Sequence, residues 1–287
     1  MDVGMFPWTD NEIVKMVYNQ DNYKVIYTGS KSHKAIVFFS GNGIYYPNTE
    51  DEFRKQIIQN DRYEWVNISK SKRIREYYSV IILVRDIWKQ WYVNGINSKY
   101  DSVEKVVEFI KQLTKGYVVT TCGNSAGGYM ATLVGCSIGA ERIFSLSTQF
   151  YIKDVENGPL IEQNINNREK SIWMDISRMF ADYDGVFYFY PVKSDYDIVQ
   201  FERVKDTGFY IFGLDEEQHD LNIRGICYVY LLTTNNEKLL DLNKKWKGQM
   251  INKTRFFSEL MPKWVLLSYE IAFIIKSYGK KMMRMVF

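Results

Sequence analysis

Short runs of consecutive apolar residues alternate along the chain with segments whose apolar residues recur at helical spacing. The runs are rich in β-branched and aromatic residues, which is typical of strands buried on both faces. The predicted strands are residues 23–27, 35–39, 79–84, 116–121, 142–147, 186–190 and 209–212. Helices are predicted between several of these strands and for the chain after His219. This alternation predicts an α/β fold with a mostly parallel central sheet and helices on both faces.

The best-marked helix is predicted over residues 101–113, and another over residues 50–59. The large apolar residues of the first helix fall on one face and would dock on the sheet. They are Val103, Val106, Val107, Ile110 and Leu113. Asp101 and Glu104 are spaced as in a capping box, in which the first side chain accepts a backbone N–H and the second reaches back.

One segment departs from this pattern. Between Tyr151 and Asp184 the apolar periodicity weakens around an Asn-rich, charged stretch. A chain of 287 residues, 46% of them apolar, is long enough for one α/β domain with a full core. We therefore predict a single domain over residues 1–287, with a lid or loop insertion at 151–184 and a basic helical region at 236–287.

Cysteine usage and the start of the chain bear on the compartment. Cys122, Cys136 and Cys227 are an odd number without C-x-x-C spacing, which argues against a disulfide framework and a zinc site. The start of the chain is acidic and lacks the apolar region of a secretory signal. No run reaches the roughly 18 uncharged apolar residues of a membrane-spanning helix. These features predict a cytoplasmic protein without a metal centre.

Charge is unevenly distributed along the chain. Ten Lys or Arg residues and two Glu residues from Lys244 to Phe287 give this region a net charge of +8, which leaves −5 for the preceding residues because the total is +3. With Trp246 and Trp264, the region predicts either contact with an anionic membrane surface or an ordinary solvated basic face. Nucleic-acid binding is not predicted, because no zinc-finger, helix-turn-helix or RNP signature accompanies the charge.

The chemical signal is the sequence Cys122-Gly123-Asn124-Ser125-Ala126-Gly127-Gly128. This G-x-S-x-G motif lies between the strand at 116–121 and an apolar helical segment at 129–134, the strand–turn–helix setting that mounts a nucleophilic serine. Such a turn is strained, and glycines two residues to either side avoid collisions with the neighbouring strand and helix. The alternative is a plain Gly-rich turn. We predict that Ser125 is a catalytic nucleophile.

A serine nucleophile needs a base, and the base needs an orienting acid. The chain has two histidines. His33 precedes a strand and would lie at the sheet edge opposite to the one where strand C-termini gather ligands. His219 follows the strand at 209–212 and would lie on the same edge as Ser125. We predict that His219 is the base.

The acid should follow the strand at 186–190, where Asp195 and Asp197 compete. They would point to opposite sides of an extended segment, so only one would face His219. We favour Asp197, at the start of a short helix, and hold Asp195 in reserve. Asp215 is too close to His219 in sequence to be preferred.

A G-x-S-x-G elbow followed by an acid and then a histidine resembles the α/β-hydrolase superfamily, from about Lys24 to Tyr230. The resemblance implies an oxyanion hole built from the N–H of Ala126 and an N–H of the loop after an early central strand. That loop is Phe39-Ser40-Gly41-Asn42-Gly43 here, with Ser40 in place of the family's histidine. Asn42 or Gly43 would supply the second donor.

More narrowly, the aromatic loop after the strand at 79–84 and residues 194–200 are similar to small α/β-hydrolase-type proteins of bacterial surface-polysaccharide loci. Some of these are sugar O-acetyltransferases and others are regarded as esterases. The resemblance implies that Trp88, Trp91 and Tyr92 lie near the catalytic edge, where their rings would bind sugar faces. Burial in the core is the alternative for aromatic residues.

Together these features predict serine-dependent acyl transfer through an acyl-enzyme. The protein would act on a small ester or a carbohydrate or polysaccharide ester, either as an esterase or deacetylase that needs no cofactor or as an O-acetyltransferase. Acetyl-coenzyme A would be the donor for the transferase, although no Gly-rich phosphate-binding loop with a lysine supports it. The alternative from another class is a non-catalytic α/β-hydrolase-like binding or scaffold protein in surface-polysaccharide assembly.

Overall fold

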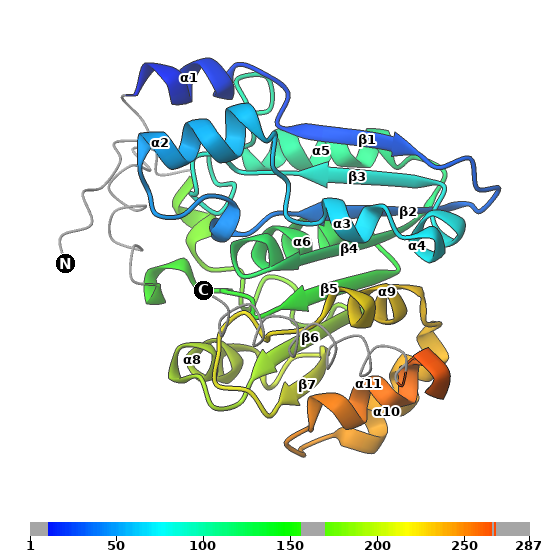
Figure 1. The fold of residues 1–287 in the computed structure, drawn as a ribbon. Coiled ribbons are helices and arrows are strands. Elements are labelled where there is room, and N and C mark those ends of the chain that lie inside the picture. The colour runs from blue at the N-terminus through cyan, green and yellow to red at the C-terminus, as the bar shows by residue number, and fades with distance from the viewer. Residues whose placement is uncertain (1–10, 156–169, 266, 268–287) are drawn as a thin grey trace, which may run out of the picture.

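A seven-stranded sheet with helices on both faces forms the centre of the protein, which was analysed as a computed structural model that describes residues 11–155, 170–265 and 267 (Figure 1). The strand order is β1-β3-β2-β4-β5-β6-β7. Only β1 runs antiparallel to its neighbour β3, and the other pairs are parallel. The strands are β1 (Tyr23–Tyr27), β2 (Lys34–Phe39), β3 (Val80–Val84), β4 (Val118–Asn124), β5 (Arg142–Leu146), β6 (Val186–Pro191) and β7 (Tyr210–Leu214). The predicted α/β class and the strands are confirmed.

Helices and short helical turns fill the connections. The helices are α1 (Glu12–Tyr18), α2 (Glu50–Phe53), α3 (Val66–Ser69), α4 (Lys72–Tyr77), α5 (Val103–Leu113), α6 (Ala126–Ile138), α8 (Asp195–Val204), α9 (Gly225–Thr233), α10 (Asn236–Trp246) and α11 (Lys253–Leu260). The helical turns are η1 (Asn42–Ile44), η2 (Arg54–Gln59), η3 (Ile152–Asp154) and η4 (Lys170–Met174). The helix predicted over 50–59 is thus α2 continued by the π-helical turn η2. None of the described helices is both long and apolar enough to cross a bilayer.

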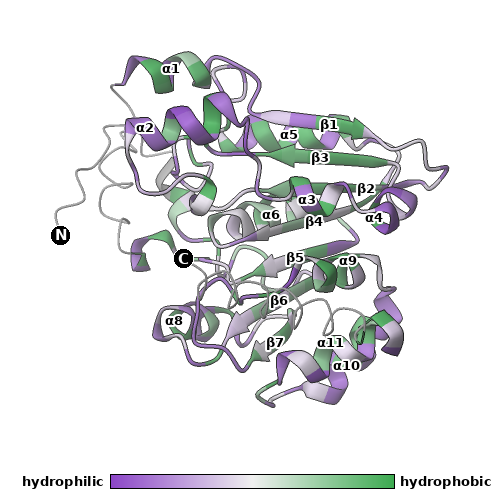
Figure 2. Ribbon diagram, viewed as in Figure 1, coloured by the Kyte–Doolittle hydropathy of each residue, from purple (hydrophilic) through white to green (hydrophobic). Residues whose placement is uncertain are grey.

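The sheet separates two layers of the hydrophobic core. In β2, Val37 and Phe39 pack with α5 and α6, whereas Ile36 and Phe38 pack with α3, α9 and the C-terminal helices. Alternate side chains of a strand point to opposite faces, so a fully apolar strand needs cover on both sides. Figure 2 shows the resulting pattern, with hydrophobic strands inside and polar outer faces on the helices.

The start of α5 differs from the prediction. The N-terminal cap is Ser102, whose Oγ accepts the backbone N–H of Lys105, and not Asp101. Asp101 instead forms an ion pair with the Lys105 side chain at 2.7 Å. Glu104 accepts a hydrogen bond from the indole of Trp173. The predicted capping box is wrong because the helix begins at Val103, which places Ser102, in the extended conformation of an N-cap, and not Asp101, directly before it.

The two less regular regions are described in part. Within the predicted insertion, its first residue Tyr151 forms an antiparallel bridge with Asp175, and residues 156–169 lie outside the described residues. In the basic C-terminal region, the apolar side chains of α10 and α11 belong to the core below α9, including Trp246 and Phe256. The described start of this region is therefore an integral part of the domain. Residues 266 and 268–287 lie outside the described residues.

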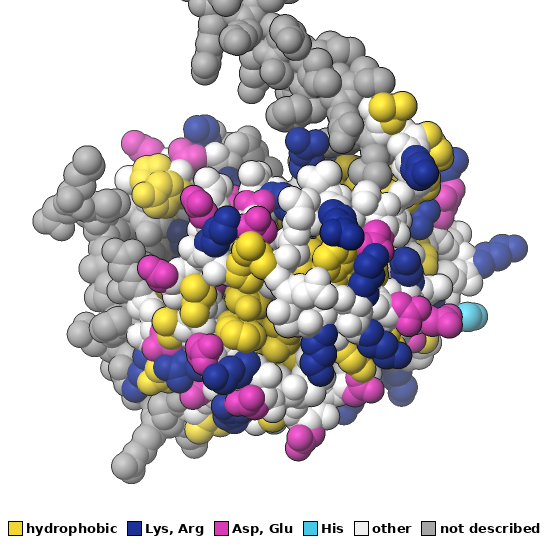
Figure 3. Space-filling model, turned by 90° about the horizontal axis from the view of Figure 1, so that it is seen from below, with side chains coloured by type: hydrophobic (Ala, Val, Ile, Leu, Met, Phe, Trp, Pro, Cys, Tyr) yellow, Lys and Arg dark blue, Asp and Glu magenta, His cyan; other side chains and the backbone are white. Residues whose placement is uncertain are grey.

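The edge strand β7 is partly covered. Ile251 pairs with Leu214 in parallel, and the Asn243 amide donates to the carbonyl of Ile211. A groove of about 710 Å³ remains beside this edge. Figure 3 views the molecule from this side and shows apolar side chains among charged ones.

Candidate active site

Ser125 stands at the junction of β4 and α6, where the chain turns sharply from strand to helix. Its backbone has φ 57° and ψ −122°, a conformation that L-residues rarely adopt. The turn is held because the Ser125 N–H donates to the carbonyl of Leu146 at the end of β5, at 2.8 Å. Strain that is fixed by its surroundings is typical of a functional turn.

The glycines around Ser125 are required by close backbone approaches. A Cβ on Gly123 would lie 2.1 Å from the carbonyl oxygen of Gly127. A Cβ on Gly127 would lie 2.3 Å from the carbonyl oxygen of Phe39 in β2. A side chain at Gly123 would push β4 away from the start of α6, and one at Gly127 would push α6 away from β2. The G-x-S-x-G spacing therefore has a steric cause here.

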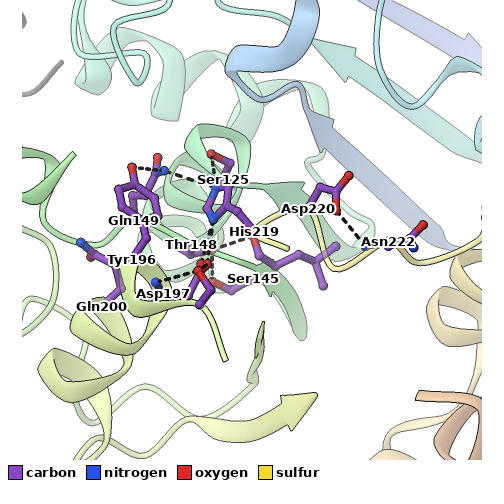
Figure 4. A network of polar contacts seen from close by, with 12 residues as sticks. Ser125, Ser145, Thr148, Gln149, Tyr196, Asp197, Gln200, His219, Asp220 and Asn222 are labelled. Carbon is purple, nitrogen blue, oxygen red and sulfur yellow. Dashed lines mark hydrogen bonds and ion pairs between the residues drawn. The ribbon is translucent and has the colours of Figure 1, made fainter. Parts of the chain in front are cut away.

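Ser125, His219 and Asp197 form one chain of polar contacts (Figure 4). The Ser125 hydroxyl lies 2.9 Å from Nε2 of His219. Nδ1 of the same ring lies 2.9 Å from Oδ1 and 3.0 Å from Oδ2 of Asp197. Because a carboxylate only accepts hydrogen bonds, Nδ1 carries the proton and Nε2 is left to accept the serine proton. The imidazole is thereby aligned as a base toward Ser125.

Asp197 is held in place by the first turn of α8. It is fully buried, and one of its oxygens accepts a hydrogen bond from the N-terminal cap residue Ser194 at 2.6 Å. Asp195, two residues earlier on the helix, is exposed. Since two helical residues span about 200°, only one of the two aspartates faces the sheet edge. The structure brings Asp197, not Asp195, to His219.

The remaining acid and histidine lie elsewhere. Asp215 forms an ion pair with Lys193 at 2.5 Å. His33 is exposed in the turn before β2, at the opposite edge of the sheet.

The predicted oxyanion residues lie beside the elbow. Ala126 is the first residue of α6, and the glycine loop after β2 packs against the other side of the turn: a Cβ on Gly41 would lie 2.7 Å from the carbonyl oxygen of Asn124. Asn42 and Gly43 begin η1, where the first N–H groups of a helical turn have no partner within it. The N–H of Gly41 is already used, because it donates to Oε2 of Glu64 at 2.6 Å.

The aromatic loop after β3 does not form the predicted sugar platform. Tyr92 is fully buried and Trp91 is 3% exposed, so their ring faces are not available to a sugar, and that prediction was wrong for both. Trp88 is partly buried and stacks on Tyr18 with ring centroids 3.9 Å apart. One face of Trp88 is thus covered, and its contact with substrate stays a prediction.

Asp86 explains why this loop turns inward. Its buried carboxylate accepts the backbone N–H groups of Trp88, Gln90 and Tyr92 at 2.7–2.9 Å. Three non-glycine residues within four positions of this loop have positive φ, namely Lys89, Trp91 and Tyr92. A backbone wound around one carboxylate in this way directs the aromatic rings into the core, which the sequence pattern did not reveal.

Gln149 and Tyr196 complete the surroundings of the histidine and were missed in the sequence. The Gln149 amide nitrogen lies 3.4 Å from Nε2 of His219 and donates to the Tyr196 hydroxyl at 2.6 Å. Gln149 accepts in turn from the indole N–H of Trp91 at 2.7 Å. Its position just after β5 was an available signal, because residues that follow parallel strands gather at this edge.

A polar groove lies beside Glu64, the residue that accepts the N–H of Gly41. The groove has a volume of about 1150 Å³ and is lined by Glu64, Asp220 and the cations Arg62, Lys70 and Arg75, among other residues. No ion pair between these three cations and another residue of the described chain is found. The described residues contain no cluster of three or more His, Cys, Asp or Glu side chains suited to a metal ion.

Comparison with known proteins supports the fold. No protein-family model and no curated protein matches the sequence. Among solved structures, a mutant capsule O-acetyltransferase of Neisseria meningitidis serogroup A in complex with CoA is similar, with a TM-score of 0.52, 13% identity, and coverage of 75% of this chain and 93% of that one. A structure of the same O-acetyltransferase in complex with caged gadolinium gives a TM-score of 0.50 at 13% identity, covering 74% of this chain and 90% of that one. With its sheet order, elbow and these structural neighbours, the chain has the fold of the α/β-hydrolase superfamily.

Proposed function

We propose that the protein is an enzyme that transfers acyl groups through a covalent intermediate on Ser125. The observation that carries the proposal is the aligned contact chain from Ser125 through His219 to the buried Asp197. A serine on a strained elbow, a base 2.9 Å away and an acid on the far side of the base are the parts that nucleophilic catalysis needs.

In the first half-reaction, Nε2 of His219 takes the proton of Ser125 as Oγ attacks the carbonyl carbon of an ester or thioester. The oxyanion formed is stabilised by the N–H of Ala126 and an N–H of Asn42 or Gly43. Fixed donors of this kind each contribute about 10²–10³ in rate. Collapse of the tetrahedral intermediate breaks the bond to the leaving alcohol or thiol, which receives the proton from His219 and leaves an acyl-Ser125.

In the second half-reaction, water or a sugar hydroxyl attacks the acyl-enzyme while His219 accepts its proton. Ser125 regains that proton as the carboxylic acid, with water as acceptor, or the sugar ester is released. Water as acceptor makes the protein an esterase or deacetylase, and a polysaccharide hydroxyl makes it an O-acetyltransferase. The similarity to a capsule O-acetyltransferase seen in complex with CoA supports the transferase.

The polar groove supports an anionic acyl donor such as acetyl-coenzyme A. Arg62, Lys70 and Arg75 line it, as does Glu64, which binds the N–H of Gly41 in the glycine loop. Phosphate groups bind well to such cations through charge-assisted hydrogen bonds. Charge reversal of Arg62 and Arg75 should raise the KM for acetyl-coenzyme A about tenfold while leaving the KM for p-nitrophenyl acetate unchanged. If the charge reversal leaves the KM for acetyl-coenzyme A at the wild-type value, the groove is not the donor site.

Labelling with a fluorophosphonate tests the nucleophile directly. The wild-type protein and Ser258→Ala, an exposed serine used as the control, should be labelled, whereas Ser125→Ala should not. Absence of labelling in the folded wild-type protein would favour the alternative, a non-catalytic binding or scaffold protein in polysaccharide assembly. Acetyl-coenzyme A turnover with and without polysaccharide then separates the transferase from the esterase.

We also propose a peripheral membrane contact at the end of the described chain. Trp264 and Leu267 are 71% and 60% exposed, with Lys263 beside them. Exposed apolar residues next to cations bind anionic interfaces. Flotation with anionic but not neutral vesicles at low salt is the expected result, and Trp264→Ala should weaken it. A cytoplasmic location, where acetyl-coenzyme A is available, stays a prediction.

A further inference from the structure

The glycine loop that would complete the oxyanion hole is held by a carboxylate that the proposed mechanism does not use. Glu64 follows η2 in the chain and lies against the loop between β2 and η1. Its Oε2 accepts the N–H of Gly41 at 2.6 Å. Its Oε1 lies 3.2 Å from the position that a Cβ of Gly43 would occupy, so the two oxygens flank both ends of the Gly41–Gly43 turn.

We propose that Glu64 is a positioning residue that holds this turn so that the N–H of Asn42 or Gly43 faces the reacting carbonyl. The inference rests on the proposed function of Ser125. By accepting the N–H of Gly41, Glu64 fixes the orientation of the peptide group at the start of the turn. It also removes Gly41 from the set of oxyanion donors, which leaves the N–H groups of the two residues that follow.

Neighbouring contacts show that Glu64 and Trp65 also bind the residues at the end of β2 and just after it. The Trp65 indole donates to the carbonyl of Phe39 at 2.9 Å. The N–H of Glu64 lies 3.4 Å from the Ser40 hydroxyl, to which it donates. Three successive residues, Phe39, Ser40 and Gly41, are therefore each bound by Glu64 or Trp65.

Other groups fix the same loop from the opposite side. Tyr92 donates from its hydroxyl to the carbonyl of Ser40 at 2.7 Å, and the N–H of Ser40 donates to Val84 in β3. The carbonyl of Ser40 and the N–H of Gly41 belong to one peptide group, so Tyr92 and Glu64 hold its two ends. Of the two side chains, Glu64 also lies against Gly43 at the far end of the turn.

A carboxylate is a costly group to place here. Burial raises the pKa of Glu64 above its ordinary value, and the Gly41 N–H, with Arg62 and Lys89 nearby, opposes that rise. A neutral side chain would fill this space at a lower desolvation cost. What the Glu64 carboxylate provides in return is a strong hydrogen-bond acceptor for the N–H of Gly41.

The test compares Glu64→Ala and Glu64→Gln with the wild-type protein. Loss of a donor position in an oxyanion hole costs about 10²–10³ in kcat, and loss of its support should cost part of that, about 10–100-fold in Glu64→Ala. The KM for a small ester should change less than threefold. Glu64→Gln keeps an oxygen acceptor and should recover most of the rate.

A transition-state analogue separates positioning from simple loss of stability. The affinity for a trifluoromethyl ketone, which forms an oxyanion on Ser125, should fall by the same factor as kcat/KM in Glu64→Ala. Asp61→Asn, in the same segment but paired with Lys24 and Arg85, is the matched control and should retain both. If Glu64→Ala does not fold, Glu64→Gln carries the test: it should lose a small part of the rate and of the ketone affinity, whereas Asp61→Asn should lose neither, and equal values in the two variants would overturn the role of Glu64.

Two failures are distinguishable. If Ser125 is labelled by a fluorophosphonate but Glu64→Ala keeps wild-type kcat and ketone affinity, the role of Glu64 is overturned and the proposed function stands. If wild-type Ser125 is not labelled, the proposed function fails and the role of Glu64 fails with it.

Discussion

Two buried polar networks lie at opposite edges of the same sheet. At the C-terminal edge, Ser125, His219 and Asp197 form a chain of contacts that begins at a fully buried carboxylate and reaches a histidine side chain that is 31% exposed. At the N-terminal edge, Arg142 at the start of β5 is 1% exposed and contacts Tyr78 and the end of α9.

The Arg142 network is closed. The guanidinium donates to the carbonyls of Leu232 and Thr234 at 3.1 and 2.6 Å and to the hydroxyl of Tyr78 at 2.7 Å. These carbonyls end α9, where a helix offers unpaired acceptors and favours a positive charge. Burial raises the pKa of Tyr78 to about 12, so its hydroxyl stays protonated and neutral. The partners of the charge are all fixed protein groups.

Buried polar groups serve two purposes in this protein, because one network stabilises the fold and the other prepares a serine for reaction. The Arg142 network stabilises the fold because Nη1 and Nη2 of the guanidinium both meet partners inside it, and of the guanidinium nitrogens only Nε lacks one. The Ser125 network is open at one end and holds a strained residue, so a substrate carbonyl has a place to meet the serine. Strain and access together, rather than polarity, distinguish the candidate site.

The largest expected effect is at His219. His219→Ala should lower kcat/KM for an ester at least about 10³-fold, because the serine loses its base. His33→Ala, at the other edge of the sheet, is the matched control and should leave the rate within twofold. Steady-state ester hydrolysis measures both, and loss of activity in His33→Ala alone would reverse the assignment.

The next largest effect is expected at the acid. Asp197→Asn should lower kcat about 10²–10⁴-fold, because the amide no longer holds His219 in the tautomer that accepts the serine proton. Asp195→Asn changes an exposed residue of the same helix and should have little effect. Full activity in Asp197→Asn together with loss in Asp195→Asn would move the acid role to Asp195.

The elbow was predictable from sequence because its constraints are local. Strand, glycines, serine and helix lie within residues 116–134, and Gly123 and Gly127 are each required by a backbone a few residues or one strand away. The order of strands along the chain then placed His219 and Asp197 at the right edge. Parallel strands end together, so position along the chain becomes position in space.

The supporting groups were not predictable in this way. The contact of Glu64 with Gly41 joins residues 23 apart, and that of Gln149 with His219 joins residues 70 apart. Neither belongs to a motif or a hydrophobic pattern. The direction of Trp91 was missed for a related reason, because it depends on Asp86 collecting backbone N–H groups.

A smaller effect, on stability alone, is expected for the closed network. Arg142→Met removes the donor of the Thr234 carbonyl and the charge at the end of α9, and should destabilise the fold by about 2–4 kcal/mol. The kcat at a temperature where the variant is folded should stay within twofold. Arg54→Met, which removes a half-exposed arginine paired with Glu50, should keep the wild-type melting temperature. A loss of kcat in folded Arg142→Met would mean that the Arg142 network also supports catalysis, contrary to the distinction drawn between the two networks.

The smallest expected effect concerns Asp86, a buried carboxylate that lies at the C-terminal edge of the sheet, the same edge as Ser125. Burial raises its pKa from 3.8 to about 6, against the opposing backbone N–H groups. Between about pH 4 and pH 6 the folded protein therefore binds a proton that the unfolded chain has released, so the contribution of Asp86 to stability is largest below pH 4 and falls as pH rises to about 6.

Asp86→Asn isolates this contribution, because the variant has no proton to lose at this position. The melting temperature of the wild-type protein minus that of Asp86→Asn should decrease from pH 4 to pH 7, by the equivalent of at most about 3 kcal/mol. Asp101→Asn makes the same substitution at a half-exposed aspartate and controls for the loss of a surface charge. A difference that grows with pH would mean that the N–H groups around Asp86 outweigh its burial and lower its pKa in the folded protein.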